Sequence, residues 1–376
     1  MSDKTSLAER VPELDGMRGL AILMVLLYHI LQRNPVAMTG PFFTRLSRFA
    51  EMGWAGVDLF FVLSGFLITS ILLRTKKQPG YFQKFYARRI LRIFPLYYSA
   101  ITLLFIAMPL ISPEQTEAAR ALWPWYFFYL QNWGNALSLI PTLFSIGITW
   151  SLAIEEQFYL FWPSIVYRLD NKKLGWLAGL LALFSLGLRL LIASRFRKLL
   201  DYNKFFYFAT ITRLDSLLLG ALIALAFQSE APKKWLRALA APVLAVSLGL
   251  VIFFASRQPD SPLVDNYPMY TYGYSLIALA SAALIVMLTS YRPQNFLRRL
   301  FRGAFLRFFG KYSYALYLLQ TIPLLVFQRL FQNQTGFLNW MAYNSLVPLA
   351  CVLLALLSWN LLETRVLALK KYFEYA

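Results

Sequence analysis

Residues 13–30 read ELDGMRGLAILMVLLYHI, and this stretch decides the class of fold. It begins with Glu13, Asp15 and Arg18 and then becomes almost wholly apolar. A run of this length and composition is typical of a helix that crosses a lipid bilayer. It ends near His29, the single histidine of the chain, which would share a helix face with Arg18. A titratable side chain in such a helix is costly, so it indicates either a functional site or a hydrogen bond to a neighbouring helix.

The composition extends this interpretation to the whole chain. Of 376 residues, 59% are hydrophobic and 15% are charged, and the mean hydropathy is +0.53. Soluble globular proteins carry about 25% charged residues. We therefore predict an all-α, polytopic bundle of transmembrane helices that forms one membrane domain over residues 1–376, with no appended soluble domain. Ten spans fit the apolar runs, at about 16–31, 54–73, 90–111, 149–167, 174–194, 205–228, 236–255, 270–290, 304–331 and 338–362.

The net charge of +19 predicts orientation rather than a nucleic-acid partner. If both termini are cytoplasmic, most of the basic residues fall in the segments between spans that face the cytoplasm, as the positive-inside rule requires. A smaller group around 189–204 falls on the opposite side of the membrane. The single Cys351 lies in an apolar run, so we expect neither a disulfide framework nor a zinc or other metal site.

One aromatic stretch does not fit the scheme of spans. Residues 123–133, WPWYFFYLQNW, are apolar but too few to cross a bilayer. We expect a re-entrant or interfacial segment here, because Trp and Tyr favour the boundary between lipid and water.

Charged residues recur at one depth of the predicted bundle. In this topology His29, Asp58 and Glu155, together with Arg213 and Asp215, all lie near the outer ends of their spans. Buried charges in membrane proteins face a cavity or one another, so these residues predict either a polar site or a structural ion-pair network. Arg213 and Asp215, two positions apart, cannot share one helix face.

Two further groups of side chains suggest a ligand site. Ser151, Glu155 and Tyr159 follow one another at intervals of four and therefore share a helix face. On the predicted cytoplasmic side, the sequence FYARRILRIFP at 85–95 brings Arg88, Arg89 and Arg92 together on one helix. Such guanidinium groups would bind phosphates, although an arginine cluster is also a common cytoplasmic anchor.

Six motifs in order resemble the acyltransferase-3 family of membrane O-acyltransferases. They are Arg18 and His29 with ten residues between them, GVDLFFVLSGFLIT at 56–69, FYARRILRIFP at 85–95, TWSLAIEEQFYLFWP at 149–163, RLDSLLLGALIA at 213–224 and GKYSYALYLLQ at 310–320. The resemblance implies a ten-helix enzyme of a bacterial cytoplasmic membrane. Such an enzyme takes an acyl group, usually acetyl, from acyl-CoA to a hydroxyl, commonly on a sugar of a surface glycan or on a secreted small molecule.

The resemblance also assigns roles to residues. The arginine–histidine motif of the family falls on Arg18 and His29, its Arg-x-x-Arg motif on Arg89 and Arg92, and its glutamate on Glu155. One position departs from the pattern: the last motif often ends in histidine, and here it ends in Gln320, which cannot act as a base near neutral pH.

The resulting hypothesis is acyl transfer with His29 as general base, polarised by Glu155 or, as a second choice, by Asp58. The sequence does not distinguish direct transfer from a covalent acyl-His29 intermediate. Four arginines, Arg18, Arg88, Arg89 and Arg92, would hold the phosphates of acetyl-CoA. Three residues of the outer site, Arg213, Asp215 and Tyr159, would contact the glycan acceptor. The alternative is a transporter or flippase for an anionic or acylated solute, whose pathway would contain the same buried charges. A lipid-linked sugar transferase ranks lower because the sequence lacks an acidic pair with metal-like spacing on the first outer loop.

Overall fold

The computed structural model describes residues 11–111, 116–141, 147–195, 202–228, 230–257, 266–290 and 295–375. These residues form helices and no strand, which confirms the all-α prediction. The α-helices are α1 (Pro12–Gln32), α2 (Pro41–Glu51), α3 (Ala55–Thr75), α4 (Tyr81–Ile111), α5 (Thr116–Phe127), α6 (Gln131–Ala136), α8 (Trp150–Arg168), α9 (Asn171–Arg195), α10 (Tyr202–Phe208), α11 (Leu214–Ala226), α12 (Glu230–Ser256), α13 (Tyr274–Ser290), α14 (Phe296–Arg302), α15 (Ala304–Leu319), α16 (Thr321–Phe331), α17 (Phe337–Ser358) and α18 (Thr364–Ala368).

Seven helical segments of the described chain are long and apolar enough to cross a bilayer, or eight if one bent helix pair counts as a span. The seven agree with seven of the ten predicted spans; they are Pro12–Gln32, Pro41–Thr75, Tyr81–Ile106, Asn171–Arg195, Lys234–Ser256, Met269–Ser290 and Phe337–Phe373. Many of their apolar side chains face outward: Leu183 is 67% and Ile252 66% exposed. Outward apolar surface of this extent requires lipid rather than water around the bundle.

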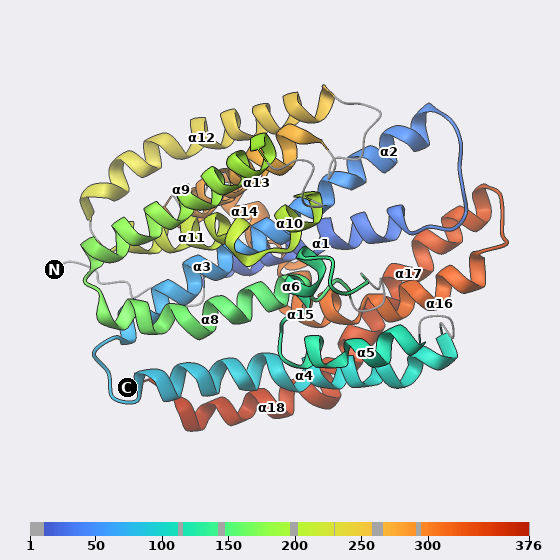
Figure 1. Cartoon of the computed structure of the whole chain (residues 1–376), viewed down its shortest axis with the longest axis horizontal. Coiled ribbons are helices and arrows are strands. Elements are labelled where there is room, and N and C mark those ends of the chain that lie inside the picture. The colour runs from blue at the N-terminus through green and yellow to red at the C-terminus, as the bar shows by residue number, and fades with distance from the viewer. Residues whose placement is uncertain are drawn as a thin grey trace.

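The long helices lie side by side along the longest axis of the molecule (Figure 1). In that view α9 and α12 form the upper edge, and α4 with α18 the lower edge (Figure 1). Between them, α1 packs against both α3 and α15. Of the site residues predicted from sequence, Arg18 and His29 lie on α1 and Asp58 lies on α3.

The crossing of α1 and α15 depends on two glycines. A Cβ atom at Gly19 would lie 1.9 Å from the carbonyl oxygen of Leu306, and one at Gly310 would lie 1.8 Å from that of Asp15. Only glycine permits such close backbone contact, which is a common way for membrane helices to pack. The two helices run in the same direction from this crossing, because His29 of α1 and Gln320 at the end of α15 are also in contact.

The predicted span 304–331 is bent: α15 and α16 meet at an angle of 60°, and together they are apolar enough to count as one broken span. The break falls at Gln320, and Pro323 lies in the first turn of α16. Proline has no N–H with which to bond the carbonyl of Leu319, so the helical ladder is interrupted here. The bend places the Gln320 side chain inside the bundle, where its exposure is 0%.

The predicted span 205–228 is wrong as a single helix. It divides into α10, a 3₁₀ turn (Thr210–Thr212) and α11, which is only 13 residues long. The hydroxyl of Thr212 lies 2.8–3.2 Å from the carbonyl oxygens of Phe205, Phe206 and Ala209. This side chain therefore satisfies carbonyls that a continuing helix would have bonded.

The aromatic stretch 123–133 forms the end of α5, a turn and the start of α6 rather than one helix. The turn contains Tyr129, whose φ of 55° lies in the left-handed region. Gln157 of α8 fixes this turn, since its amide nitrogen donates to the carbonyl of Tyr129 at 2.8 Å and to the side-chain oxygen of Asn132 at 2.9 Å. The segment thus packs against α8 as a short, irregular insertion.

Candidate active site

Two adjoining cavities open among the central helices. The first encloses about 410 Å³ and is lined by His29; we call it the histidine cavity. The second encloses about 100 Å³ and is lined by Arg18, Arg89 and Arg92; we call it the arginine cavity. Among the described residues, Val57 and Tyr317 line both cavities, so the two spaces meet at these side chains.

The hydrogen bonds of Gln320 define the state of His29. The Gln320 Nε2 group donates to the carbonyl oxygen of Tyr317 at 2.9 Å. A carbonyl only accepts, so the amide oxygen Oε1 must face His29 Nδ1, at 3.2 Å. The neutral imidazole therefore carries its proton on Nδ1 and keeps the lone pair of Nε2, the nitrogen that a general base uses.

The arginine cavity carries an excess of positive charge. Within the described part of the chain, its lining contains three guanidinium groups and one carboxylate, that of Glu155. Glu155 Oε1 accepts a hydrogen bond of 2.7 Å from Ser64 Oγ, and Arg18 Nη1 pairs with Asp15 Oδ1 at 2.9 Å. A cavity of this kind is suited to an anion with several oxygen atoms, because guanidinium groups bind phosphate with paired hydrogen bonds.

Arg88, the neighbour of Arg89 on α4, has a different environment. Its Nη1 lies 3.4 Å from the carbonyl oxygen of Lys370 and 3.3 Å from that of Phe373, and its guanidinium lies 5.5 Å from the ring of Tyr375. The structure therefore brings Arg18, Arg89 and Arg92 together and places Arg88 against the C-terminal segment.

The face of α8 that the sequence predicted lines the arginine cavity with Ser151, Glu155 and Tyr159. The ring of Tyr159 lies 5.9 Å from the Arg89 guanidinium. Glu155 and His29 line different cavities, so the structure does not place them in the pairing that the sequence hypothesis assigned. Among the described side chains, it is Gln320 that lies within hydrogen-bond distance of the imidazole.

Asp58, the second candidate to polarise His29, belongs to a buried ion pair. Its carboxylate oxygens lie 2.9 and 3.0 Å from Arg213 Nη2, and Ser216 Oγ donates to it at 2.9 Å. Asp58 and Arg213 are both 0% exposed. The Arg213 guanidinium also lies 3.7 Å from the centre of the Tyr274 ring. This arrangement joins α3 to the start of α11.

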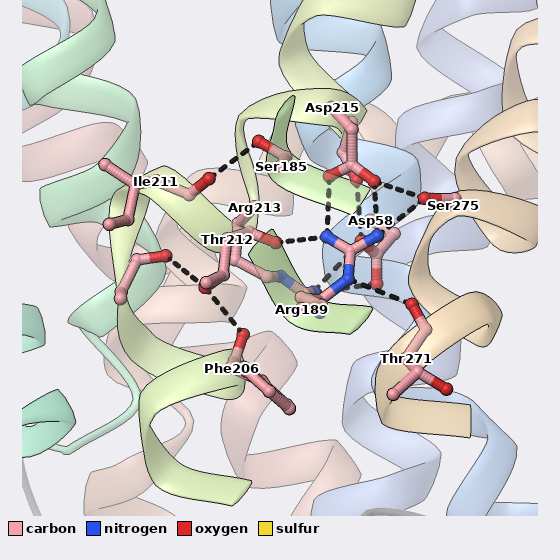
Figure 2. A network of polar contacts seen from close by, with 12 residues as sticks. Asp58, Ser185, Arg189, Phe206, Ile211, Thr212, Arg213, Asp215, Thr271 and Ser275 are labelled. Carbon is pink, nitrogen blue, oxygen red and sulfur yellow. Dashed lines mark hydrogen bonds and ion pairs between the residues drawn. The ribbon is translucent and has the colours of Figure 1, made fainter. Parts of the chain in front are cut away.

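Asp215 belongs to a second ion pair beside the first (Figure 2). Arg189 Nη2 lies 2.7 Å from Asp215 Oδ2, and Ser275 Oγ donates to the same oxygen at 2.5 Å. Arg189 Nε donates to the carbonyl of Thr271 at 3.0 Å, and its Nη1 to that of Thr212. Figure 2 shows these groups converging on the guanidinium from several helices. The structure thus places Arg213 and Asp215 in a network that connects helices.

Sequence reasoning counted Arg189 with the basic residues of an outer loop, yet its exposure is 0%. The available signal was its position inside the predicted span 174–194, where an arginine needs a carboxylate partner. Aromatic side chains of the histidine cavity were also missed: Trp54, Trp150 and Tyr207 line it. They come from a 3₁₀ turn (Met52–Trp54), α8 and α10, and spacing along the sequence does not connect such distant elements.

Comparison with known proteins agrees with the motifs. The acyltransferase-3 family model, described as an acyltransferase domain, matches residues 11–362. The chain is 31% identical over 324 residues to the peptidoglycan O-acetyltransferase OatA of Listeria monocytogenes, a match that covers 82% of this chain and 48% of that protein. It is 30% identical over 341 residues to the putative peptidoglycan O-acetyltransferase YrhL of Bacillus subtilis, which covers 85% of this chain and 49% of that protein.

A putative O-acetyltransferase of Staphylococcus aureus strain COL is 29% identical over 330 residues, 82% of this chain and 50% of its own length. The chain therefore spans about half the length of the curated relatives it matches. No solved structure matches it. With a family match over nearly its whole length, the chain is a multi-pass membrane protein that belongs to the acyltransferase-3 family.

Proposed function

We propose that the protein is a membrane O-acetyltransferase that moves an acetyl group from acetyl-CoA in the arginine cavity to a sugar hydroxyl in the histidine cavity. The observation that supports this proposal is the meeting of a cavity lined by three arginines with a cavity lined by His29, at Val57 and Tyr317. The printed names of the relatives, peptidoglycan O-acetyltransferases, support acetyl transfer to a glycan.

The arginine cavity is the proposed donor site. Arg18, Arg89 and Arg92 would bind the phosphates of CoA, and the narrow pantetheine arm would extend toward Tyr317. Arg18 and His29 lie eleven positions apart on α1, about 16 Å along a helix axis. That separation leaves room for the arm between a phosphate and the reacting thioester. We also infer that the arginine side faces the cytoplasm, where acyl-CoA is made and where the positive-inside rule places basic clusters.

The histidine cavity is the proposed acceptor site. Aromatic rings stack on the C–H faces of sugars, and Trp54, Trp150 and Tyr207 supply such rings beside His29. Asn203 and Lys204 add polar groups to the same lining. The acceptor we infer is a hydroxyl on a cell-surface glycan such as peptidoglycan, on the other side of the membrane from CoA.

The chemistry follows from the tautomer of His29. Nε2 takes the proton of the acceptor hydroxyl while the oxygen attacks the thioester carbonyl. The new C–O bond forms, the C–S bond of acetyl-CoA breaks, and the CoA sulfur leaves and takes up the proton from the imidazolium. The ester and free CoA are the products. General-base catalysis of this kind is worth about 10²–10⁴-fold in rate.

The test uses the full chain purified in detergent, with labelled acetyl-CoA and peptidoglycan fragments as acceptor. The variants are His29→Ala, the pair Arg89→Ala/Arg92→Ala, and Arg88→Ala as a matched control on the same helix. We expect His29→Ala to bind acetyl-CoA but to lose transfer by about 10²–10⁴-fold. The double arginine variant should bind acetyl-CoA more weakly and recover rate at high concentration. Arg88→Ala should keep the affinity for acetyl-CoA.

Two results would contradict the proposal. If the wild-type protein does not bind acetyl-CoA, the donor site is wrong, and transport of an anionic or acylated solute becomes the better interpretation. If His29→Ala transfers acetyl groups at the wild-type rate, the histidine is a packing residue.

A further inference from the structure

Tyr317 forms much of the boundary between the two cavities. It lies on α15 one turn before Gln320 and lines both the arginine and the histidine cavity. On one side of it lies Glu155, and on the other lies His29. Any group that passes from one cavity to the other must pass this ring and the side chain of Val57.

Hydrogen bonds hold Tyr317 in this place. Its hydroxyl donates to the carbonyl oxygen of Ile148 at 2.6 Å, so it accepts the bond of 2.6 Å from Ser151 Oγ. The side chain is 6% exposed, and Phe60 contacts its ring edge-on with the centroids 6.4 Å apart. A ring with both of these restraints cannot change rotamer without losing two hydrogen bonds, so it is a fixed wall.

From this position we infer that Tyr317 determines the size of the acyl group that the enzyme transfers. The inference rests on the proposed function, because it assumes that the thioester reaches the boundary from the arginine cavity. That cavity encloses only about 100 Å³, against about 410 Å³ on the histidine side. An acetyl group fits against the wall, whereas each further methylene of a longer chain would meet the Tyr317 ring.

The test compares acetyl-CoA, butyryl-CoA and octanoyl-CoA as donors for one acceptor. The variant Tyr317→Ala removes the wall and joins the cavities, so we expect the ratio of octanoyl to acetyl transfer to rise about tenfold or more. Tyr317→Phe keeps the ring and loses the hydroxyl, so it should keep the preference for acetyl.

Tyr314 provides the matched control. It lies on the same helix and lines the arginine cavity but not the histidine cavity. Its hydroxyl donates to the carbonyl oxygen of Ile93 at 2.7 Å. Tyr314→Ala should change the rate without changing the chain-length preference. The intact fold of each variant is checked by its unfolding temperature, and Tyr317→Leu replaces the alanine variant if the latter does not fold.

The outcomes separate this inference from the proposed function. If wild type transfers acetyl groups and Tyr317→Ala keeps the same chain-length preference, the inference is wrong and the function stands. An equal change in Tyr314→Ala would likewise overturn it, since any enlargement of the cavity would then suffice. If wild type transfers no acyl group, the proposed function itself fails.

Discussion

His29 Nδ1 and Gln320 Oε1 lie 3.2 Å apart although the two residues are 291 positions apart in sequence. Each follows a glycine of the α1–α15 crossing by ten positions, His29 after Gly19 and Gln320 after Gly310. Equal steps along two helices that run the same way bring the two side chains to the same level of the bundle. The tautomer of the histidine thus depends on a helix crossing at some distance from it.

Gln320→Leu should lower acetyl transfer while the affinity for acetyl-CoA stays unchanged. The leucine removes the acceptor that keeps the proton on Nδ1. General-base catalysis contributes about 10²–10⁴-fold to the rate, and we expect kcat to fall by about 10-fold or more of that contribution. Gln320→Glu keeps an oxygen toward His29 and should retain more activity than the leucine variant. The measurement is kcat and KM with the unfolding temperature as a check on fold. Equal kcat in wild type and Gln320→Leu would show that the bond does not position the base.

Gly310→Ala should destabilise the protein and reduce its activity together. The new methyl group would lie 1.8 Å from the carbonyl oxygen of Asp15, so α15 must move away from α1 and Gln320 away from His29. Gly249→Ala in α12 is the matched control, because nothing lies within 4 Å of its Cβ position. The control should be as stable as wild type or slightly more stable. Thermal unfolding in detergent measures both, and similar unfolding temperatures would contradict the tight crossing.

Asp58→Asn should impair folding rather than the chemical step. The substitution leaves Arg213 buried without its carboxylate, and breaking a buried pair in this way costs about 3–5 kcal/mol. Asp170→Asn provides the comparison, since the Asp170–Lys173 pair is exposed, with an Nζ–Oδ2 distance of 3.7 Å, and such pairs contribute about 0–1 kcal/mol. We expect less folded Asp58→Asn protein, with kcat per folded molecule near that of wild type. A stable Asp58→Asn variant with strongly reduced kcat would show that Asp58 takes part in the reaction.

The sequence was sufficient for the helical bundle, because long apolar runs in a bilayer have few structures open to them. It did not predict the helix breaks within residues 205–228 and 304–331, because the apolar composition continues through each break. In each case a local device interrupts the helix, the Thr212 hydroxyl in one and Pro323 in the other. Hydropathy averages over these single residues and does not detect them.

The sequence also identified most of the charged side chains of the site but grouped them by depth alone. Depth along a span does not say toward which neighbour a side chain points. Asp58 and Glu155 were placed at one level, yet Asp58 pairs with Arg213 and Glu155 accepts a bond from Ser64. These pairings depend on how each helix is rotated about its axis. The pairing of Arg189 of α9 with Asp215 is likewise evident only from the three-dimensional packing.

The wall between the cavities has an energetic consequence for a cell with a membrane potential. Each elementary charge carried across a bilayer at 100 mV exchanges about 2.3 kcal/mol with the field. The arginines lie on one side of Tyr317 and His29 on the other, so under the proposed function the multiply charged nucleotide would stay on the side where it binds. In the proposed reaction the acetyl group passes the ring in one direction and a proton reaches the CoA sulfur in the other, so no net charge crosses the membrane. Export of the acyl group is then electroneutral, and its rate should not depend on the voltage across the membrane.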